Sequence, residues 1–215
     1  MATRQVLKRG TLGDVVIETE NGRVSTIRDF EPARWRWLAR RLAAHEANVL
    51  LRLEGLDGIP SLISFDRARL IRSFVSGAAM HSGPPPSLAY FRNALRLLRL
   101  MHRRRVVHND LAKEANWIHR EGDRAGIVDF QLAICFVRRN RWFRSLARED
   151  LRHLLKHKRH YHPDSLSARQ QAILARPSWP ARAWRALFKP PYRLVTRRLL
   201  GWPERADANE RQRTH

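Results

Sequence analysis

The sequence predicts a small two-lobed α+β fold, because strand patterns and helix patterns follow one another in separate blocks along its 215 residues. Residues 4–30 read as strands and residues 33–54 as a long amphipathic helix. A second amphipathic helix is expected over residues 87–105, and a loop with a hairpin follows between Val106 and Phe130. Carboxylate and amide side chains gather in that last stretch, where we expect the functional site.

The first block predicts three strands, over Arg4–Lys8, Asp14–Thr19 and Arg23–Phe30. Asn21 and Gly22 lie between the second and third strands, and both residue types accept the positive φ of a tight hairpin turn. The strands are therefore expected to form an antiparallel sheet.

The helix expected over residues 33–54 has apolar residues three and four apart, with Pro32 before it and Gly55 after it. Two more strands are expected over Ile59–Phe65 and Ala68–Val75. This order places five strands and one helix in the first lobe.

The stretch from Val106 to Phe130 predicts two short strands joined by a turn, Asn116–His119 and Gly126–Phe130. Such a hairpin would bring Asp110 and Asn116 close to Asp129. Oxygen donors of these types suit a hard divalent cation such as Mg²⁺, which also retains waters and phosphate oxygens as ligands.

The segment HNDLAKEAN, residues 108–116, resembles the catalytic loop H-x-D-L-x-x-x-N of protein-kinase-like phosphotransferases, and VDFQ, residues 128–131, resembles their D-F-G segment. The form D-F-Q in so short a chain is most similar to RIO-type kinases and bacterial lipopolysaccharide (Kdo) kinases. The resemblance implies a kinase fold with an N-lobe over residues 1–77 and an abbreviated C-lobe over residues 78–175.

The resemblance also implies roles for individual residues. Asp110 would orient or deprotonate the acceptor hydroxyl, and Asn116 and Asp129 would bind Mg²⁺ next to the ATP phosphates. Asn116 lies six residues after Asp110, whereas the family usually places this Asn at five. Asp150, in a basic helical segment over residues 138–160, would either brace the catalytic loop or form a surface salt bridge.

In the N-lobe the resemblance assigns Arg28 to the position where kinases carry their phosphate-anchoring Lys, and Glu46 to the helix position that pairs with it. A surface arginine and a solvated glutamate are the alternatives. The loop with Gly10 and Gly13 could cover ATP phosphates with its backbone, or form an ordinary turn.

The charge is strongly positive: 42 Lys and Arg against 20 Asp and Glu give a net charge of +22. This excess predicts an anionic partner, either a membrane surface or nucleic acid. The basic and aromatic segment over residues 176–202 suits an in-plane membrane anchor, although packing on the C-lobe and nucleic-acid binding use the same residue types. Residues 203–215 read as a disordered tail.

The sequence contains no apolar run of membrane-spanning length, no secretory signal and a single cysteine, Cys135. A cytoplasmic protein, peripheral on the inner face of the membrane, is therefore expected. The predicted function is ATP- and Mg²⁺-dependent phosphorylation of a hydroxyl, on a protein Ser or Thr or on an envelope lipid or sugar such as lipopolysaccharide core. The alternative is a catalytically weak kinase-like module that binds an anionic membrane or RNA.

Overall fold

The computed structural model describes residues 3–8, 14–20, 23–30, 35–66 and 68–175. All of them belong to one of the two units into which the chain's contacts divide it, Met1–Ser178. The segment over residues 176–202 and the tail over residues 203–215 lie outside the described residues.

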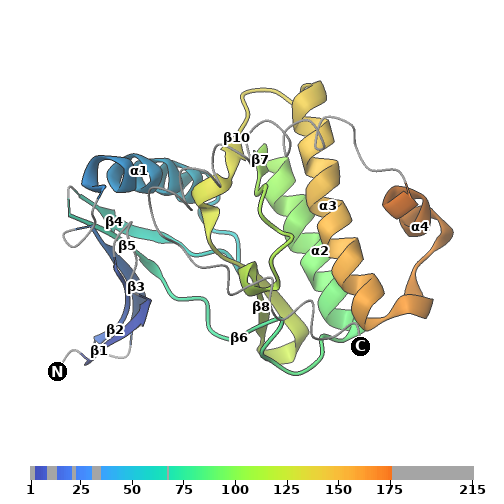
Figure 1. Ribbon diagram of the computed structural model, residues 1–215, viewed down its shortest axis with the longest axis horizontal. Helices are drawn as coiled ribbons and strands as arrows, with labels where there is room; N and C mark the ends of the chain where they lie inside the picture. Colours follow the sequence, from blue (N-terminus) through green and yellow to red (C-terminus); the bar gives the residue numbers. More distant parts are fainter. Residues whose placement is uncertain (1–2, 9–13, 21–22, 31–34, 67, 176–215) are drawn as a thin grey trace. The chain divides into compact units, whose positions relative to one another are not determined.

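A five-stranded antiparallel sheet forms the N-terminal part, in the order β1-β2-β3-β5-β4 (Figure 1). Its strands are β1 (Thr3–Lys8), β2 (Asp14–Glu20), β3 (Arg23–Asp29), β4 (Leu62–Phe65) and β5 (Arg69–Ser73). The three N-terminal strands fall where the sequence predicts them, to within a residue at each end. β4 and β5 are shorter than expected.

Helix α1 (Arg36–Arg52) packs against this sheet with a face of small residues. Ala39, Ala43 and Ala47 recur every four residues and form a buried cluster with Phe30 and Leu70 of the sheet. Small side chains at this spacing allow the helix to lie close to the strands. That close approach brings the polar residues of the helix within reach of side chains on β3 and β5.

Gly77 lies in the segment that leaves the sheet and enters the C-terminal part. Its φ is +141°, and a Cβ there would lie 2.4 Å from the carbonyl oxygen of His119. Only glycine fits this position, since a side chain would meet backbone that cannot move aside. The strands that follow, β6 (Ala78–Ala79), β8 (Trp117–Arg120) and β9 (Arg124–Ile127), form an antiparallel sheet in the order β6-β8-β9.

Two long helices, α2 (Leu88–Arg103) and α3 (Arg141–Tyr161), pack together and support the loop between them (Figure 1). A short helix, α4 (Ala168–Ala175), contacts α3. Between α2 and α3, the two-residue strands β7 (Val106–Val107) and β10 (Ile134–Cys135) pair with each other. None of the described helices has the length and apolar character needed to cross a membrane.

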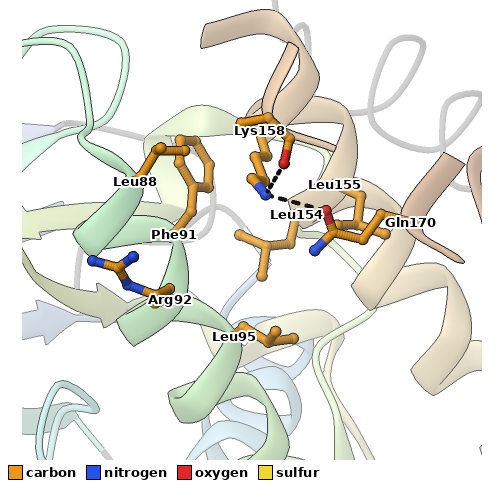
Figure 2. Close-up of a pocket in the computed structure, with 9 residues that line it drawn as sticks. Leu88, Phe91, Arg92, Leu95, Leu154, Leu155, Lys158 and Gln170 are labelled. Carbon is orange, nitrogen blue, oxygen red and sulfur yellow. Dashed lines mark hydrogen bonds between the residues drawn. The ribbon is translucent and has the colours of Figure 1, made fainter. Parts of the chain in front are cut away.

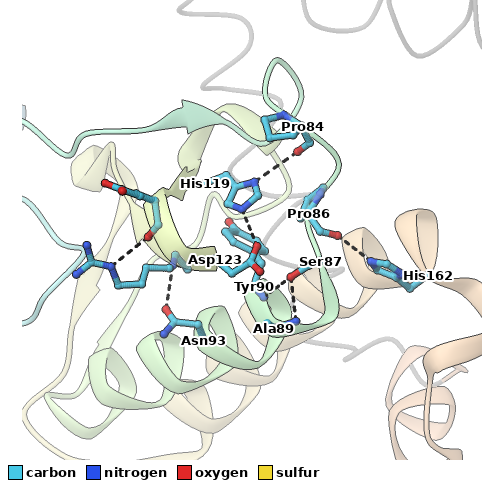
Figure 3. A network of polar contacts seen from close by, with 12 residues as sticks. Pro84, Pro86, Ser87, Ala89, Tyr90, Asn93, His119, Asp123 and His162 are labelled. Carbon is cyan, nitrogen blue, oxygen red and sulfur yellow. Dashed lines mark hydrogen bonds and ion pairs between the residues drawn. The ribbon is translucent and has the colours of Figure 1, made fainter.

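Polar contacts hold the start of α2 to the hairpin of β8 and β9 (Figure 3). Ser87 is the N-cap of α2, and its hydroxyl accepts from the backbone N–H groups of Ala89 and Tyr90, at 3.1 Å each. Ala125 N of β9 donates to Oδ1 of Asn93 on α2 at 2.9 Å, and within the hairpin His119 Nε2 lies 3.0 Å from Asp123 Oδ1. The hairpin is thus positioned against the helix that leads into the loop of residues 108–116.

Candidate active site

Asp150 of α3 fixes the loop that begins after β7. Its carboxylate is 1% exposed and accepts two backbone hydrogen bonds, from His108 N at 2.8 Å and Asn109 N at 3.0 Å. His102 Nε2 lies 3.2 Å from the same carboxylate. Of the two roles open from the sequence, the structure shows the brace and not a surface salt bridge.

His108 lies inside the core, where its ring packs on Phe130 with 4.8 Å between the ring centroids. Its Nε2–H donates to the carbonyl oxygen of Val128 at 3.0 Å. This bond ties the loop before Asp110 to the backbone immediately before Asp129. The two carboxylates are therefore held on segments that are bonded to each other.

Asn116 lies beside Asp110 although one residue more separates them than in the kinase pattern. A 3-10 turn over Glu114–Asn116 takes up the extra length, with Asn116 N donating to the carbonyl oxygen of Lys113 at 3.2 Å. The Asn116 amide then donates to Asp110, to its carbonyl oxygen at 2.9 Å and its Oδ2 at 3.3 Å. Lys113 Nζ is 2.5 Å from the same Oδ2. The insertion thus changes the turn and leaves the Asp–Asn contact in place.

Asp129 has a left-handed backbone conformation, with φ 67° and ψ 69°. Its Oδ1 is buried and has no hydrogen-bond partner among the described residues. Burial is the largest influence on its pKa and would raise it, but the charges of Arg28, Arg72 and Lys113 outweigh burial and hold the pKa below its usual range. Asp129 is therefore an ionised carboxylate with an unused oxygen in a buried position.

The side-chain oxygens of Asp129 and Asn116 are of the type that Mg²⁺ prefers. In the described part of the chain, no group of three or more His, Cys, Asp and Glu side chains forms a protein-only metal site. Mg²⁺ commonly takes only one or two protein ligands and completes its shell with water and substrate phosphates. The unpartnered oxygen of Asp129 and the side-chain oxygen of Asn116, which accepts no hydrogen bond from a described residue, are the donors that would hold it.

Glu46 of α1 is fully buried and pairs with two arginines of the sheet. Its Oε2 lies 3.4 Å from Nη1 of Arg28, and its Oε1 contacts Nη1 of Arg72. Arg28 is paired with Leu70 across β3 and β5, and Thr26 is paired with Arg72. Residues two apart on a strand point to the same face, so Arg28 and Arg72 are diagonal neighbours on the face that α1 covers.

The two arginines lie close enough to Asp129 for their charges to act on one another. Burial lowers the pKa of Arg72 to about 10, with a smaller contribution from repulsion by Arg28, and Asp129 opposes that shift. Burial also lowers the pKa of Arg28, again opposed by Asp129. Arg28, Arg72, Glu46 and Asp129 thus form one buried cluster of two positive and two negative charges.

Arg72 is the site residue that the sequence analysis missed. The signal was present in β5, since Arg72 follows the fully buried Leu70 by two residues and must share its inward face. A charged residue at an inward position needs a partner, and the only acid in the interior of the facing helix is Glu46. The kinase resemblance points to one cation, Arg28 on β3, and not to the second, Arg72 on β5.

A further contact joins α1 to the segment after Asp129, where His45 Nε2–H donates to the carbonyl oxygen of Ala133 at 2.6 Å. Gly10 and Gly13, the expected phosphate-covering glycines, lie outside the described residues.

A cavity lies away from these side chains, between α2, α3 and α4. It measures about 230 Å³ and is lined by leucines and Phe91 (Figure 2). Lys158 crosses its edge and donates to the carbonyl oxygen of Ser165 at 2.9 Å and to Gln170 Oε1 at 3.1 Å. None of the candidate site residues lines this cavity, so it is separate from the candidate active site.

Comparison with known protein families finds no match for the sequence, and comparison with curated proteins finds none. Among solved structures, the RIO2 kinase from Chaetomium thermophilum is similar, with a TM-score of 0.58 and 14% sequence identity. The match covers 86% of this chain and 66% of the kinase chain, so the chain spans slightly less than two thirds of that protein. At this identity the likeness concerns the fold alone: the chain has a protein-kinase-like fold.

Proposed function

We propose that the protein is an ATP- and Mg²⁺-dependent phosphotransferase that transfers the γ-phosphate of ATP to a hydroxyl group. The observation that carries the proposal is the convergence of Asp110, Asn116 and Asp129, joined through the His108–Val128 bond, beside a buried Arg28–Glu46–Arg72 cluster. A kinase needs little covalent chemistry from its protein, and mostly needs positioning and charge stabilisation.

Each residue has a distinct task in this proposal. Asp110 accepts the proton of the acceptor hydroxyl, and the Asn116 amide holds its carboxylate in place. Asp129 and Asn116 hold the Mg²⁺, which when bound screens the charge of the phosphates. Arg28 is positioned by Glu46 to pair phosphate oxygens, the role that the resemblance assigns to it. Gly10 and Gly13 are proposed to cover the phosphates with backbone N–H groups.

The acceptor is proposed to be a protein Ser or Thr, or an envelope lipid or sugar such as lipopolysaccharide core. The net charge of +22 supports an anionic acceptor or an anionic surface that carries it. The basic, aromatic segment over residues 176–202 supports the inner face of a membrane ahead of nucleic acid, since its aromatics share a face with leucines in the sequence pattern.

A second candidate function is a catalytically weak kinase-like module that binds anionic lipid or RNA. Two features favour it. Lys113 contacts the carboxylate of Asp110 at 2.5 Å, where it competes with the acceptor hydroxyl for that oxygen. The anchoring cation is Arg28 rather than Lys, and the two side chains are not interchangeable at a phosphate site.

Turnover of radiolabelled ATP tests the first proposal, with Asp110→Asn and Asp129→Asn as variants and Glu121→Gln as the matched control. Glu121 is an exposed acid in the same hairpin, and its side chain forms no hydrogen bond or ion pair with a described residue. We expect each aspartate variant to lose about 100-fold or more of the turnover and the control to retain it. Equal turnover in the wild type and both aspartate variants would end the enzyme proposal.

Thermal unfolding with ATP, with and without Mg²⁺, separates the two candidates. Binding to the folded state raises the melting temperature whether or not phosphate is transferred. A shift without turnover supports the weak module, and turnover that the aspartate variants lose supports the kinase.

A further inference from the structure

Exposed arginines gather where the C-terminal end of α2 meets the connection from β10 to α3. We call this surface the arginine edge. It comprises seven exposed arginines and two exposed apolar residues: Arg103, Arg104, Arg105, Arg138, Arg139, Arg141, Arg144, Val137 and Trp142.

Backbone contacts bring the two halves of the arginine edge together, although more than 30 residues separate them. Pairing of β7 with β10 places the chain after Cys135 beside Arg105, and Phe136 N donates to the Arg105 carbonyl oxygen at 2.9 Å. Arg105 contacts the carbonyl oxygen of Val137, and Arg139 Nη2 donates to the carbonyl oxygen of His102 at 3.3 Å. In Figure 1 the connection from β10 to α3 runs past the end of α2. The arginines therefore form one surface.

Their charges are not neutralised within the described structure. No Asp or Glu occurs in residues 99–109 or 130–148. The side chains of four arginines form no hydrogen bond or ion pair with any residue that the structure describes: Arg103, Arg138, Arg141 and Arg144. The two acids that follow on α3, Glu149 and Asp150, are buried, and Asp150 accepts backbone hydrogen bonds from the loop after β7. A dense set of exposed arginines with no acid among them favours an anionic partner.

The apolar members of the edge distinguish among anionic partners. Val137 is 80% exposed and Trp142 is 58% exposed, whereas Phe136 and Phe143 turn inward and pack edge to face with 5.5 Å between centroids. Folding thus buries Phe143, partly buries Phe136, and leaves Val137 and Trp142 outside, among the arginines. Stacking on single-stranded bases uses aromatic rings, which Trp142 offers but the more exposed Val137 does not.

We propose that the arginine edge docks on an anionic lipid bilayer, with Val137 and Trp142 in the interface and the arginines on the lipid phosphates. Tryptophan favours the headgroup level of a bilayer, and each basic residue near an anionic surface adds to binding. The arginine edge includes none of residues 176–202, and the proposal does not depend on phosphotransfer.

Sedimentation of the full-length chain with phosphatidylcholine vesicles, with and without phosphatidylglycerol, tests the proposal. One variant reverses two arginines of the edge, Arg138→Glu/Arg141→Glu. The matched control reverses two exposed arginines on the middle of α2, Arg92→Glu/Arg96→Glu, so that both variants have the same net charge. Arg141 is the first residue of α3, where a glutamate is favourable to the helix, so the edge variant should fold. Circular dichroism checks both.

We expect the wild type to bind only the anionic vesicles, and the edge variant to bind about 30-fold more weakly or worse. The control variant should lose several-fold less affinity for the anionic vesicles than the edge variant does. A third variant, Val137→Ser/Trp142→Ser, keeps every charge and should also lose about tenfold or more, because it removes the apolar contact with the interface.

Three results would overturn the proposal: no binding of the wild type to anionic vesicles, equal losses in the edge and control variants, or no loss on removing Val137 and Trp142. Competition with single-stranded RNA completes the test. If RNA binds the wild type, depends on the arginine edge and displaces the vesicles, the edge is a nucleic-acid surface and the proposal is wrong.

Discussion

Replacing Arg72 by methionine should destabilise the protein strongly, because it removes the shorter of the two contacts of a carboxylate that has no access to water. Glu46 is fully buried, and after the change only Arg28, at 3.4 Å, remains for it. Methionine fills similar volume, so the cost arises mainly from the unbalanced charge. Breaking a buried ion pair by removing one partner costs about 3–5 kcal/mol.

The matched control is Arg69→Met on the same strand. Arg69 lies 3.6 Å from Asp29 in an exposed pair, with side chains 41% and 26% exposed. Exposed pairs contribute about 1 kcal/mol or less. Urea unfolding, followed by circular dichroism, measures both free energies of unfolding. The reasoning fails if Arg72→Met and Arg69→Met cost the same.

A double-mutant cycle with Glu46→Gln separates charge from packing. If Arg72 mainly balances Glu46, the double variant should lose less than the sum of the two single variants, with a coupling of about 1–3 kcal/mol. Additive losses would mean that Arg72 contributes by packing alone, and the buried cluster would then not be an electrostatic unit.

Three further outcomes are expected. Asp150→Asn has one side-chain oxygen left to accept from the backbone N–H groups of His108 and Asn109. We expect the free energy of unfolding to fall by about 1–3 kcal/mol and the His108 amide to exchange its hydrogen faster. Unchanged exchange would contradict the bracing role. Gly77→Ala places a Cβ against the carbonyl of His119 and should lower the free energy of unfolding by more than about 1 kcal/mol, and a stabilised variant would show that the conformation is not required. Burial, aided by the charge of a neighbouring lysine, lowers the pKa of His153 to about 4. On acidification the unfolded chain therefore protonates His153 before the folded chain does, and the free energy of unfolding should fall as the pH drops from about 6.5 toward 4. His153→Gln should flatten this part of the pH dependence, measured by unfolding curves at several pH values, and an unaltered slope would assign the pH dependence to other groups.

Local chemistry explains which parts of the fold were predictable from the sequence. Ser87 caps α2, and β2 and β3 are rich in the β-branched residues Val, Ile and Thr, so each of these elements is specified by its own residues. β7 and β10 have two residues each and are defined by their pairing with each other, so no local pattern could reveal them. Helix α1 begins at Arg36, three residues later than expected.

The candidate site divides in the same way. Asp110 and Asp129 were identified from a motif, and their proposed roles are still predictions. The contact of Asn116 with Asp110 could not be foreseen from the spacing, because a 3-10 turn absorbs the additional residue. The inward position of Arg72 could be inferred from β5, but its place diagonal to Arg28 depends on the register between β3 and β5, and that register is a property of the folded sheet.

The charge balance of the buried cluster bears directly on the choice between an active kinase and a weak module. Arg28 and Arg72 are matched by Glu46 and Asp129, so the cluster offers a nucleotide no net positive charge. Phosphates that arrive alone would compete with two carboxylates for the same arginines. If the phosphates arrive with Mg²⁺, the metal would pair with Asp129, and the arginines would then be able to pair with the phosphate oxygens. The second arginine is therefore compatible with phosphotransfer if nucleotide and metal enter together, which makes Mg²⁺ dependence the property on which the kinase proposal depends most.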